Sequence, residues 1–243
     1  MVHRFKFLSI IVPTFKEVGN LRPLITRIAA VMDKVSMPYE LIVVDDDSQD
    51  GSSEIINELA EKDYPVHIIT RIAERGLSTA VIHGFNEAKG DVLVCMNADL
   101  SHPPEVLLCL IKVFEDSKVE FAIGSRYVPG ASTAESWGMF RWLNSKLATL
   151  LARPFTQVKD PMAGFFMLPR SVFKRARSLN PIGYKIGLEL IAKCSCHNIV
   201  EVPINFENRT YGQSKLNIRE QFNYIKHLKR LWDFKLGDLS YFF

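Results

Sequence analysis

Residues 91–103 have the sequence DVLVCMNADLSHP. The apolar run that opens this stretch predicts a short buried β-strand, and the polar residues behind it end at a proline. Asn97, Asp99 and Ser101 therefore follow a strand directly. A carboxylate in this position, with amide or hydroxyl oxygens beside it, suits a hard divalent cation such as Mg²⁺ or Mn²⁺. The alternative is that Asp99 only caps a helix that begins near residue 104.

The same alternation of short apolar runs and amphipathic stretches extends outward from this strand. Strands are predicted at 8–12, 39–44, 66–69, 91–96, 121–124, 163–168 and 200–206. Helices are predicted at 20–35, 52–62, 77–87, 104–116, 140–152 and 185–194. Strands of four to six residues that alternate with helices indicate an α/β fold with a mostly parallel, Rossmann-like sheet and flanking helices.

Polar clusters follow four of the predicted strands. They lie at 13–17, 45–50, 71–76 and 97–102. Ligands of open α/β sheets bind outside the carboxyl ends of the strands, so these clusters predict a site at one edge. Asp45, Asp46 and Asp47 place three negative charges at one strand end, which costs free energy unless a ligand binds there or the side chains diverge.

The composition excludes several classes of protein. A chain of 243 residues without an internal repeat or a linker predicts a single domain. A formal net charge of +3 gives no reason to expect nucleic acid as a partner. Four cysteines without the spacing of a disulfide scaffold favour a reducing compartment. No apolar run reaches eighteen residues, so neither a membrane-spanning helix nor a signal peptide is expected.

Basic residues in the second half of the chain are candidates for anion binding, because arginine and lysine recognise phosphate. They are Arg126, Arg141, Lys185, Arg209 and Lys215. The segment at 212–215 is not a P-loop, since the required glycine spacing is absent. No Gly-x-Gly-x-x-Gly follows the first strand, which argues against a dinucleotide oxidoreductase.

The tail at 216–236 has the pattern of an amphipathic helix. One stripe is apolar, with Phe222, Ile225, Leu228, Leu231 and Trp232, and basic residues surround it. This composition suits a helix that lies in a membrane interface. A terminal helix that packs on its own domain, with a basic face toward water, fits the same pattern.

Seven short segments follow one another along the chain, namely IVPTFKE at 11–17, VVDDDS at 43–48, RGLS at 75–78, NADLSHP at 97–103, GSRY at 124–127, DPMAGF at 160–165 and RTYGQSK at 209–215. With these segments in this order, the chain resembles the dolichyl- or polyprenyl-phosphate mannosyltransferases of glycosyltransferase family 2, from residue 9 to about residue 236. Each motif alone is weak, and their order is specific.

The resemblance implies a GT-A fold and a role for each matching position. Nucleoside contacts fall on Pro13, Phe15, Glu17 and Asp45, and metal contacts on Asn97, Asp99 and Ser101. Acceptor-phosphate contacts fall on Arg126, Arg141 and Ser145, and donor phosphate or sugar contacts on Lys185 and Arg209. Of these residues, the resemblance makes Asp99, Arg126, Lys185 and Arg209 the catalytic candidates.

Two positions depart from the family pattern. The usual aspartate at 97 is asparagine, which removes a charge from the metal site but keeps an oxygen. The usual tyrosine at 15 is phenylalanine, which keeps the ring and loses a hydroxyl.

The acceptor phosphate is already an anion near neutral pH, so no general base is required. Glu189 is a candidate base without a necessary task.

The expected activity is inverting transfer of a hexose from a nucleotide sugar to a polyprenyl phosphate, with Mg²⁺ or Mn²⁺. GDP-mannose is favoured over UDP-glucose as the donor. A glycan hydroxyl as acceptor and a catalytically weak sugar-nucleotide-binding scaffold are the alternatives. Residues 1–215 are expected to form the catalytic domain and 216–243 a tail at the membrane interface. The protein is expected on the cytoplasmic face of a membrane as a peripheral protein, with a membrane-anchoring protein as a further partner.

Overall fold

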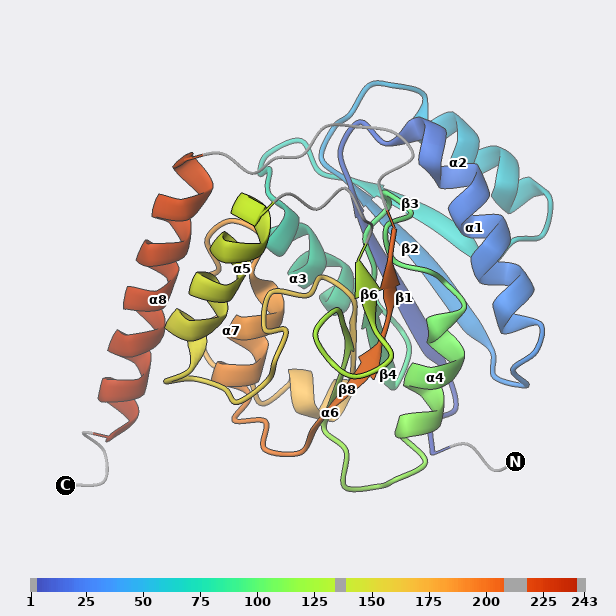
Figure 1. Ribbon diagram of the computed structural model, residues 1–243. Helices are drawn as coiled ribbons and strands as arrows, with labels where there is room; N and C mark the ends of the chain where they lie inside the picture. The colour runs from blue at the N-terminus through green and yellow to red at the C-terminus, as the bar shows by residue number, and fades with distance from the viewer. Residues whose placement is uncertain (1–3, 134–138, 208–217, 240–243) are drawn as a thin grey trace.

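The computed structural model describes residues 4–133, 139–207 and 218–239, apart from the side chains of residues 139–143, 218–219 and 238–239. The described residues form one central sheet with helices on both faces (Figure 1). Its seven strands lie in the order β3-β2-β1-β4-β7-β5-β8. They are β1 Leu8–Thr14, β2 Tyr39–Asp45, β3 Val66–Thr70, β4 Val92–Cys95, β5 Phe121–Ser125, β7 Phe166–Pro169 and β8 Ile199–Pro203.

Eight helices are found in the described residues. They are α1 Val18–Met32, α2 Ser52–Glu61, α3 Leu77–Glu87, α4 Val106–Val113, α5 Met139–Ala152, α6 Arg170–Phe173, α7 Ile186–Lys193 and α8 Ile218–Leu239. A small second sheet pairs β6 Ser132–Thr133 with β9 Asn205–Phe206. The predicted α/β fold and the predicted order of strands and helices are confirmed.

The direction of strand β7 was not predicted by the sequence pattern. This strand runs antiparallel to both of its neighbours, β4 and β5, whereas the other pairs of the large sheet are parallel. The chain segment before β7 therefore lies at the edge where β4 and β5 end. An apolar run of four residues carries no information about strand direction, which its neighbours decide.

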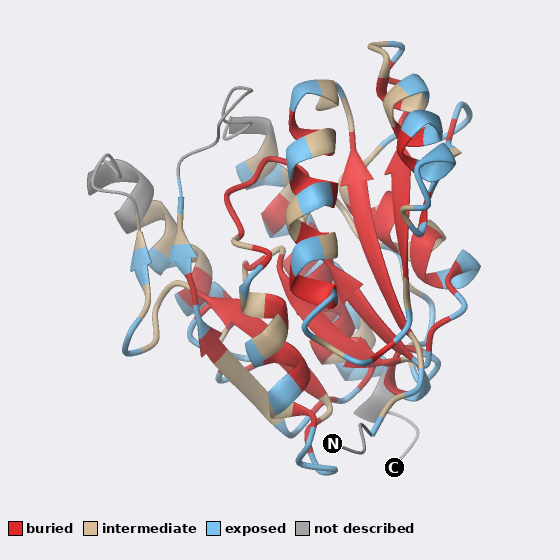
Figure 2. Ribbon diagram, turned by 90° about the vertical axis from the view of Figure 1, so that its right-hand side faces the viewer, coloured by how far each residue is buried: buried red, intermediate tan, exposed pale blue. Residues whose placement is uncertain are grey.

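Two apolar layers cover the sheet. One lies between the strands and helices α1, α2 and α4, and the other lies between the strands and helices α3 and α7. The central strands are buried along their length (Figure 2). Strands buried on both faces favour apolar residues, which explains their nearly continuous apolar runs.

Helix α8 packs on the domain with one side and exposes apolar residues on the other. Tyr224, Leu228 and Leu231 are buried in a small cluster with α5 and α7, and α8 lies beside these helices in Figure 1. Phe222 and Ile225, by contrast, are 61% and 58% exposed. The apolar stripe predicted for the tail is therefore divided between the core and the surface. None of the described helices is long and apolar enough to span a bilayer.

Helix α3 approaches β1 and β2 closely at Gly84. A Cβ atom at this position would lie 2.7 Å from Ile11 Cγ2 and 3.0 Å from Val44 Cγ2, both in buried side chains. Gly84→Ala is therefore expected to lower the free energy of unfolding by about 1–3 kcal/mol, because the added methyl overpacks the core. Urea unfolding followed by circular dichroism measures the change.

Gly237 is the matched control, because it is an exposed glycine in helix α8, and a Cβ at its position would meet no described atom within 4 Å apart from its chain neighbours and the backbone of its own helix. Gly237→Ala should raise the free energy of unfolding by roughly 0.5–1 kcal/mol through helix propensity alone. Equal effects of the two substitutions would contradict the close approach of α3 to the sheet.

Candidate functional site

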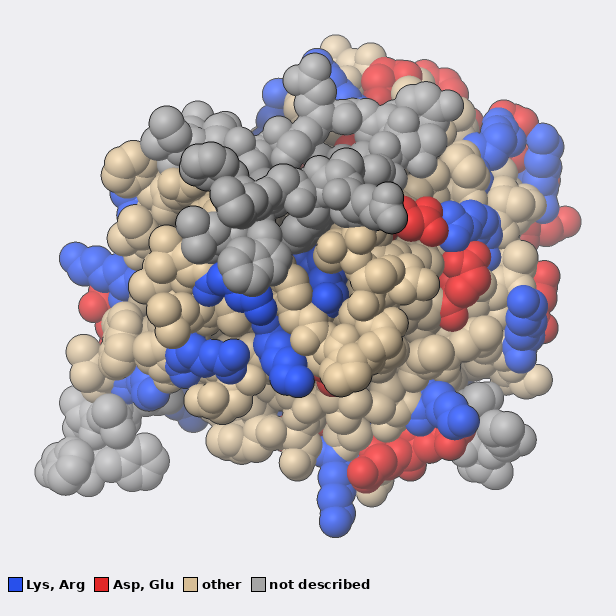
Figure 3. Space-filling view, viewed as in Figure 1, with Lys and Arg blue, Asp and Glu red and all other residues tan. Residues whose placement is uncertain are grey.

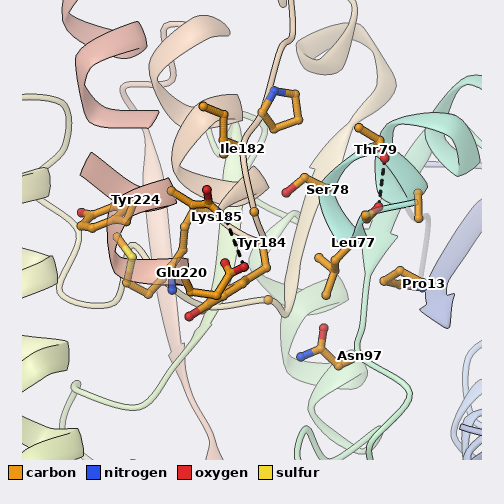
Figure 4. Close-up of a pocket in the computed structure, with 18 of the residues that line it drawn as sticks. Pro13, Leu77, Ser78, Thr79, Asn97, Ile182, Tyr184, Lys185, Glu220 and Tyr224 are labelled. Carbon is orange, nitrogen blue, oxygen red and sulfur yellow. Dashed lines mark hydrogen bonds between the residues drawn. The ribbon is translucent and has the colours of Figure 1, made fainter. Parts of the chain in front are cut away.

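A cavity of about 930 Å³ opens at the carboxyl edge of the sheet. Its walls come from the residues after β1, β4 and β5, the start of α3, the side of α5, the loop before α7 and the first turns of α8. Figure 4 shows Lys185, Glu220 and Tyr224 on one side of this cavity and Pro13 and Asn97 on the other. The predicted edge of the sheet is thus where the pocket lies.

The residues after β4 contribute an oxygen pair to the cavity wall. Asn97 and Asp99 both line the cavity. Ser101 lies behind them, fully buried, and its backbone N–H and hydroxyl donate to Asp99 Oδ1 at 3.2 and 2.5 Å. Asn97 Oδ1 is buried, and none of the described residues donates a hydrogen bond to it. A buried acceptor without a donor, beside a carboxylate, fits a hard cation.

This oxygen pair is a small ligand set. The described residues contain no group of three His, Cys, Asp or Glu side chains that could hold a metal ion. Mg²⁺ and similar ions commonly take one or two protein carboxylates and complete their shell with substrate phosphates and water. The donor set therefore fits a cation that is held together with a phosphate ligand.

The three consecutive aspartates that begin with the last residue of β2 diverge to three different partners. Asp45 is buried behind the cavity wall, where it accepts hydrogen bonds from the backbone N–H and the hydroxyl of Ser48. Asp46 lines the cavity and forms a buried ion pair with Arg71. Asp47 meets the exposed Arg75 at 3.2 Å. Divergence thus relieves the repulsion that the sequence predicts, and Asp46 rather than Asp45 faces the cavity.

Phe15 and Glu17, after β1, form the wall next to these aspartates with Pro13. The Phe15 ring carries two cations, Arg75 at 5.4 Å and Lys16 at 5.5 Å from its centroid. Glu17 accepts a hydrogen bond of 2.6 Å from the side chain of Asn20. Three of the four residues predicted for a nucleoside pocket therefore lie together, with an aromatic face among them, while the fourth, Asp45, does not line the cavity.

Arg126, directly after β5, is held by the carboxylate of Asp160, which the strand-end pattern of the sequence did not identify as its partner. Asp160 is fully buried, and it accepts hydrogen bonds from the backbone N–H, Nε and Nη2 of Arg126 at 3.0, 2.7 and 2.7 Å. Burial lowers the pKa of Arg126, but Asp160 outweighs it and raises the pKa above the usual value. The motif at 160–165 contained the signal, although antiparallel β7 was needed to place it here.

Ser145, on α5, also lines the cavity, and its Oγ accepts a hydrogen bond of 2.6 Å from the hydroxyl of Tyr127. Arg126 and Ser145 were both predicted to contact the acceptor phosphate. They lie on one side of the pocket, because Tyr127, which follows Arg126 in the chain, bonds to Ser145. The side chain of Arg141 and the whole of Arg209 lie outside the described residues.

Lys185, just before α7, brings a second positive charge into the cavity. Burial and then the charge of Arg126 lower the pKa of Lys185 to about 7, while Asp160 and Glu220 act in the opposite direction. Its Nζ lies 3.9 Å from the centroid of the Tyr184 ring. A bound anion would stabilise the protonated form, so Lys185 is placed to bind phosphate.

Glu189 is fully buried on α7 and does not line the cavity. Its carboxylate lies 2.7 Å from Lys193 Nζ and 3.2 Å from His227 Nε2. Burial alone would raise the pKa of Glu189, but the contacts with His227, Lys193 and the N–H of Asn180 lower it. A carboxylate in this position cannot reach a ligand in the cavity, so Glu189 is not the general base.

The buried pair of Arg126 and Asp160 yields a stability prediction. Arg126→Ala would leave the Asp160 carboxylate without its partner, and loss of one member of a buried ion pair costs about 3–5 kcal/mol. Arg75→Ala breaks the exposed pair with Asp47, whose arginine side chain is 58% exposed, so it should cost less than about 1 kcal/mol. Urea unfolding of both variants measures the difference, and equal losses would contradict the buried role of Asp160.

Comparison with known proteins gives two kinds of similarity. The family profile described as Glycosyl transferase family 2 matches residues 9–177. The dolichol-phosphate mannosyltransferase of Saccharomyces cerevisiae is 45% identical, over 94% of this chain and 88% of that protein. The dolichol-phosphate mannosyltransferase of Mycosarcoma maydis is 42% identical, over 97% of this chain and 82% of that protein.

Solved structures show the same fold at low identity. Mannosyl-3-phosphoglycerate synthase from Rubrobacter xylanophilus has a TM-score of 0.69 at 17% identity, over 97% of this chain and 75% of that one. Glucosyl-3-phosphoglycerate synthase from Mycobacterium tuberculosis, in complex with Mn²⁺, UDP and glucosyl-3-phosphoglycerate, has a TM-score of 0.65 at 16% identity, over 93% and 78%. The predicted GT-A fold and the predicted resemblance are confirmed. The chain belongs to glycosyl transferase family 2 and, within it, to the family of the dolichol-phosphate mannosyltransferases.

Proposed function

We propose that this protein transfers mannose from GDP-mannose to dolichyl phosphate or a related polyprenyl phosphate, with inversion at the anomeric carbon. The observation that carries the proposal is a single cavity that joins an oxygen pair, Asn97 and Asp99, with two cations, Arg126 and Lys185. A sugar donor with a diphosphate and an acceptor phosphate need both kinds of group in one place. The names of the relatives at 42–45% identity support the sugar and the lipid.

The oxygen pair is proposed to hold Mg²⁺ or Mn²⁺. Asp99 and Asn97 would contact the cation, and Ser101 would act through Asp99, which it holds by two hydrogen bonds. The bound cation would neutralise negative charge on the nucleoside diphosphate as it leaves. The Mn²⁺ in a complex of a structural neighbour supports this choice of ion.

The remaining site residues divide between donor and acceptor. Pro13, Phe15 and Glu17 are proposed to form the nucleoside side of the cavity, with Asp45 fixing the turn behind them. Lys185 and Arg209 are proposed to hold the donor phosphates or sugar. The Lys185 amine, whose pKa is about 7, gains a proton as the diphosphate binds, and the resulting ammonium then stabilises the charge that develops on the leaving group.

The acceptor phosphate is proposed to bind Arg126, Arg141 and Ser145. Asp160 holds the Arg126 guanidinium by two of its nitrogens and so fixes its orientation. A phosphate monoester is already an anion near neutral pH, so its oxygen can attack the anomeric carbon without a general base. The burial of Glu189 is consistent with this scheme.

We also propose that residues 216–243 form a tail, not an independent domain, that binds the cytoplasmic face of a membrane. Exposed apolar side chains gather on α5 and α8, namely Leu147, Leu150, Leu151, Phe222, Ile225, Trp232 and Leu236. Figure 3 shows basic side chains on the side of the molecule where these helices lie. An apolar surface with lysine and arginine around it suits a bilayer with anionic lipids. An additional membrane-anchoring protein would bind here too.

The activity is tested by incubating the protein with Mn²⁺, labelled GDP-mannose or UDP-glucose, and a short polyprenyl phosphate. Lipid-linked mannose is the expected product. Asp99→Ala should lower kcat/KM by about 10²–10³, because charge stabilisation of the leaving group is lost, while Asn97→Asp should keep or raise it.

Absence of a lipid-linked sugar with either donor would overturn the proposal. Nucleotide binding without turnover would favour the scaffold alternative, and normal turnover in Asp99→Ala would refute the metal site. Circular dichroism of each variant confirms that it is folded.

Membrane binding is tested with acidic liposomes. The double variant Phe222→Gln, Leu236→Gln should sediment less with phosphatidylserine vesicles, by roughly tenfold in partition, because two apolar side chains no longer enter the interface. Ile72→Gln is the matched control, since Ile72 is 81% exposed on the loop between β3 and α3. Equal partition of the two variants would show that α8 does not contact the membrane.

A further inference from the structure

A buried ion pair on α7 has no task in the proposed mechanism. Glu189 and Lys193 are one helical turn apart, and their side chains are 0% and 3% exposed. Burying two charges costs free energy that their attraction only partly offsets, so such a pair is weak evidence for a stabilising role. The hydrogen bonds of the pair to the neighbouring loop indicate another role.

The pair holds the chain that leads to Lys185. Glu189 Oε1 accepts a hydrogen bond of 2.8 Å from the backbone N–H of Asn180. Lys193 Nζ donates to the carbonyl of Ser178 at 2.8 Å and to Asn180 Oδ1 at 2.6 Å. From Asn180 the loop runs through residues 181–185, all of which line the cavity. One end of the cavity loop is thus tied to the buried pair.

Helix α8 reaches the same loop from the other side. His227 Nε2 lies 3.2 Å from Glu189 Oε2, a close contact rather than an aligned hydrogen bond. Arg230 Nη1 donates to the carbonyl of Asn180 at 2.8 Å. Closer to the pocket, Glu220 packs against Gly183, where a Cβ atom would lie 2.8 Å from Glu220 Oε2. The loop is therefore fixed between α7 and α8.

We infer that Glu189 is a positioning residue for Lys185, acting through Asn180 and through the docking of α8. The inference rests on the proposed function only for what Lys185 binds. One buried carboxylate thus contacts both α8 and the chain that leads to the cavity lysine. The outer side of α8 carries the exposed apolar residues. Displacement of α8 would then move Lys185.

Loss of the Glu189 charge has two opposite effects on the pKa of Lys185. Removing a nearby carboxylate, taken alone, lowers the pKa of an ammonium group. Burial and the charge of Arg126 keep the pKa of Lys185 near 7. Release of the loop would expose Lys185 to water and separate it from Arg126, so its pKa would rise. The direction of the change therefore distinguishes a direct charge effect from a positioning role.

The experiment is competitive labelling of the folded, full-length protein with trace acetic anhydride between pH 5 and 11. Mass spectrometry of the Lys185 peptide then gives the midpoint of the reaction for that amine. The wild-type midpoint is expected at about 7. Glu189→Gln should raise it by about one pH unit or more. An unchanged or lower midpoint in a folded Glu189→Gln variant would overturn the inference.

A surface variant decides the matter if Glu189→Gln does not fold. Arg230→Ala removes only the exposed contact of α8 with Asn180, and it should raise the Lys185 midpoint by about half a pH unit. Lys229→Ala is the matched control, because Lys229 is the adjacent exposed cation of α8 and has no hydrogen bond or ion pair to other described residues. Equal midpoints in Arg230→Ala and Lys229→Ala would refute the coupling.

A second control separates position from general destabilisation. Glu40 is also a buried glutamate, but it accepts from Ser9 Oγ and the N–H of Lys89 at 2.6 Å, at the opposite edge of the sheet. Glu40→Gln should leave the Lys185 midpoint unchanged. The measurement needs neither donor nor acceptor, so it stands even if the proposed transferase activity fails.

Discussion

The pocket depends on the shared direction of β1, β2 and β4. Because these strands are parallel and in register, their carboxyl ends lie at one edge, and the turn after each strand adds polar residues there. Antiparallel β7 brings the segment that contains Asp160 to the same edge from the other direction. Groups as far apart in the sequence as Pro13 and Met162 thereby meet in one cavity.

Electrostatic pairing decides which of these charges face a ligand. Asp46 is neutralised by Arg71, and Arg126 is held by Asp160. Lys185 has no carboxylate at ion-pair distance among the described residues, and burial and then the charge of Arg126 lower its pKa. The cavity thus combines a pair of oxygens, on Asn97 and Asp99, with a lysine whose protonated form a bound anion would stabilise. In the proposed function, the metal ion binds the oxygen pair, and the phosphates of donor and acceptor bind the cationic side chains.

Helix α8 belongs to the site as well as to the surface. Its inner side packs on α5 and α7 and is joined to α5 by a hydrogen bond of 2.6 Å from the Tyr224 hydroxyl to the carbonyl of Ala148. Its first turns line the cavity, while Phe222 and Trp232 remain exposed. A lipid acceptor must pass from a bilayer to the pocket, and in the proposed function α8 is the element in contact with both.

The sequence by itself determined the α/β class, the edge where the site lies and the motif that contains Asp99. Apolar periodicity and strand-end residues are local properties, and parallel sheets translate them directly into position. It did not determine the direction of β7, the partner of Arg126, the divergence of Asp45, Asp46 and Asp47, or the buried role of Glu189. These depend on which distant groups are brought within hydrogen-bonding distance, and only the tertiary structure decides that. The C-terminal tail shows the same division. Its amphipathic pattern identifies a helix, but the pattern does not reveal which of the apolar residues the domain itself buries.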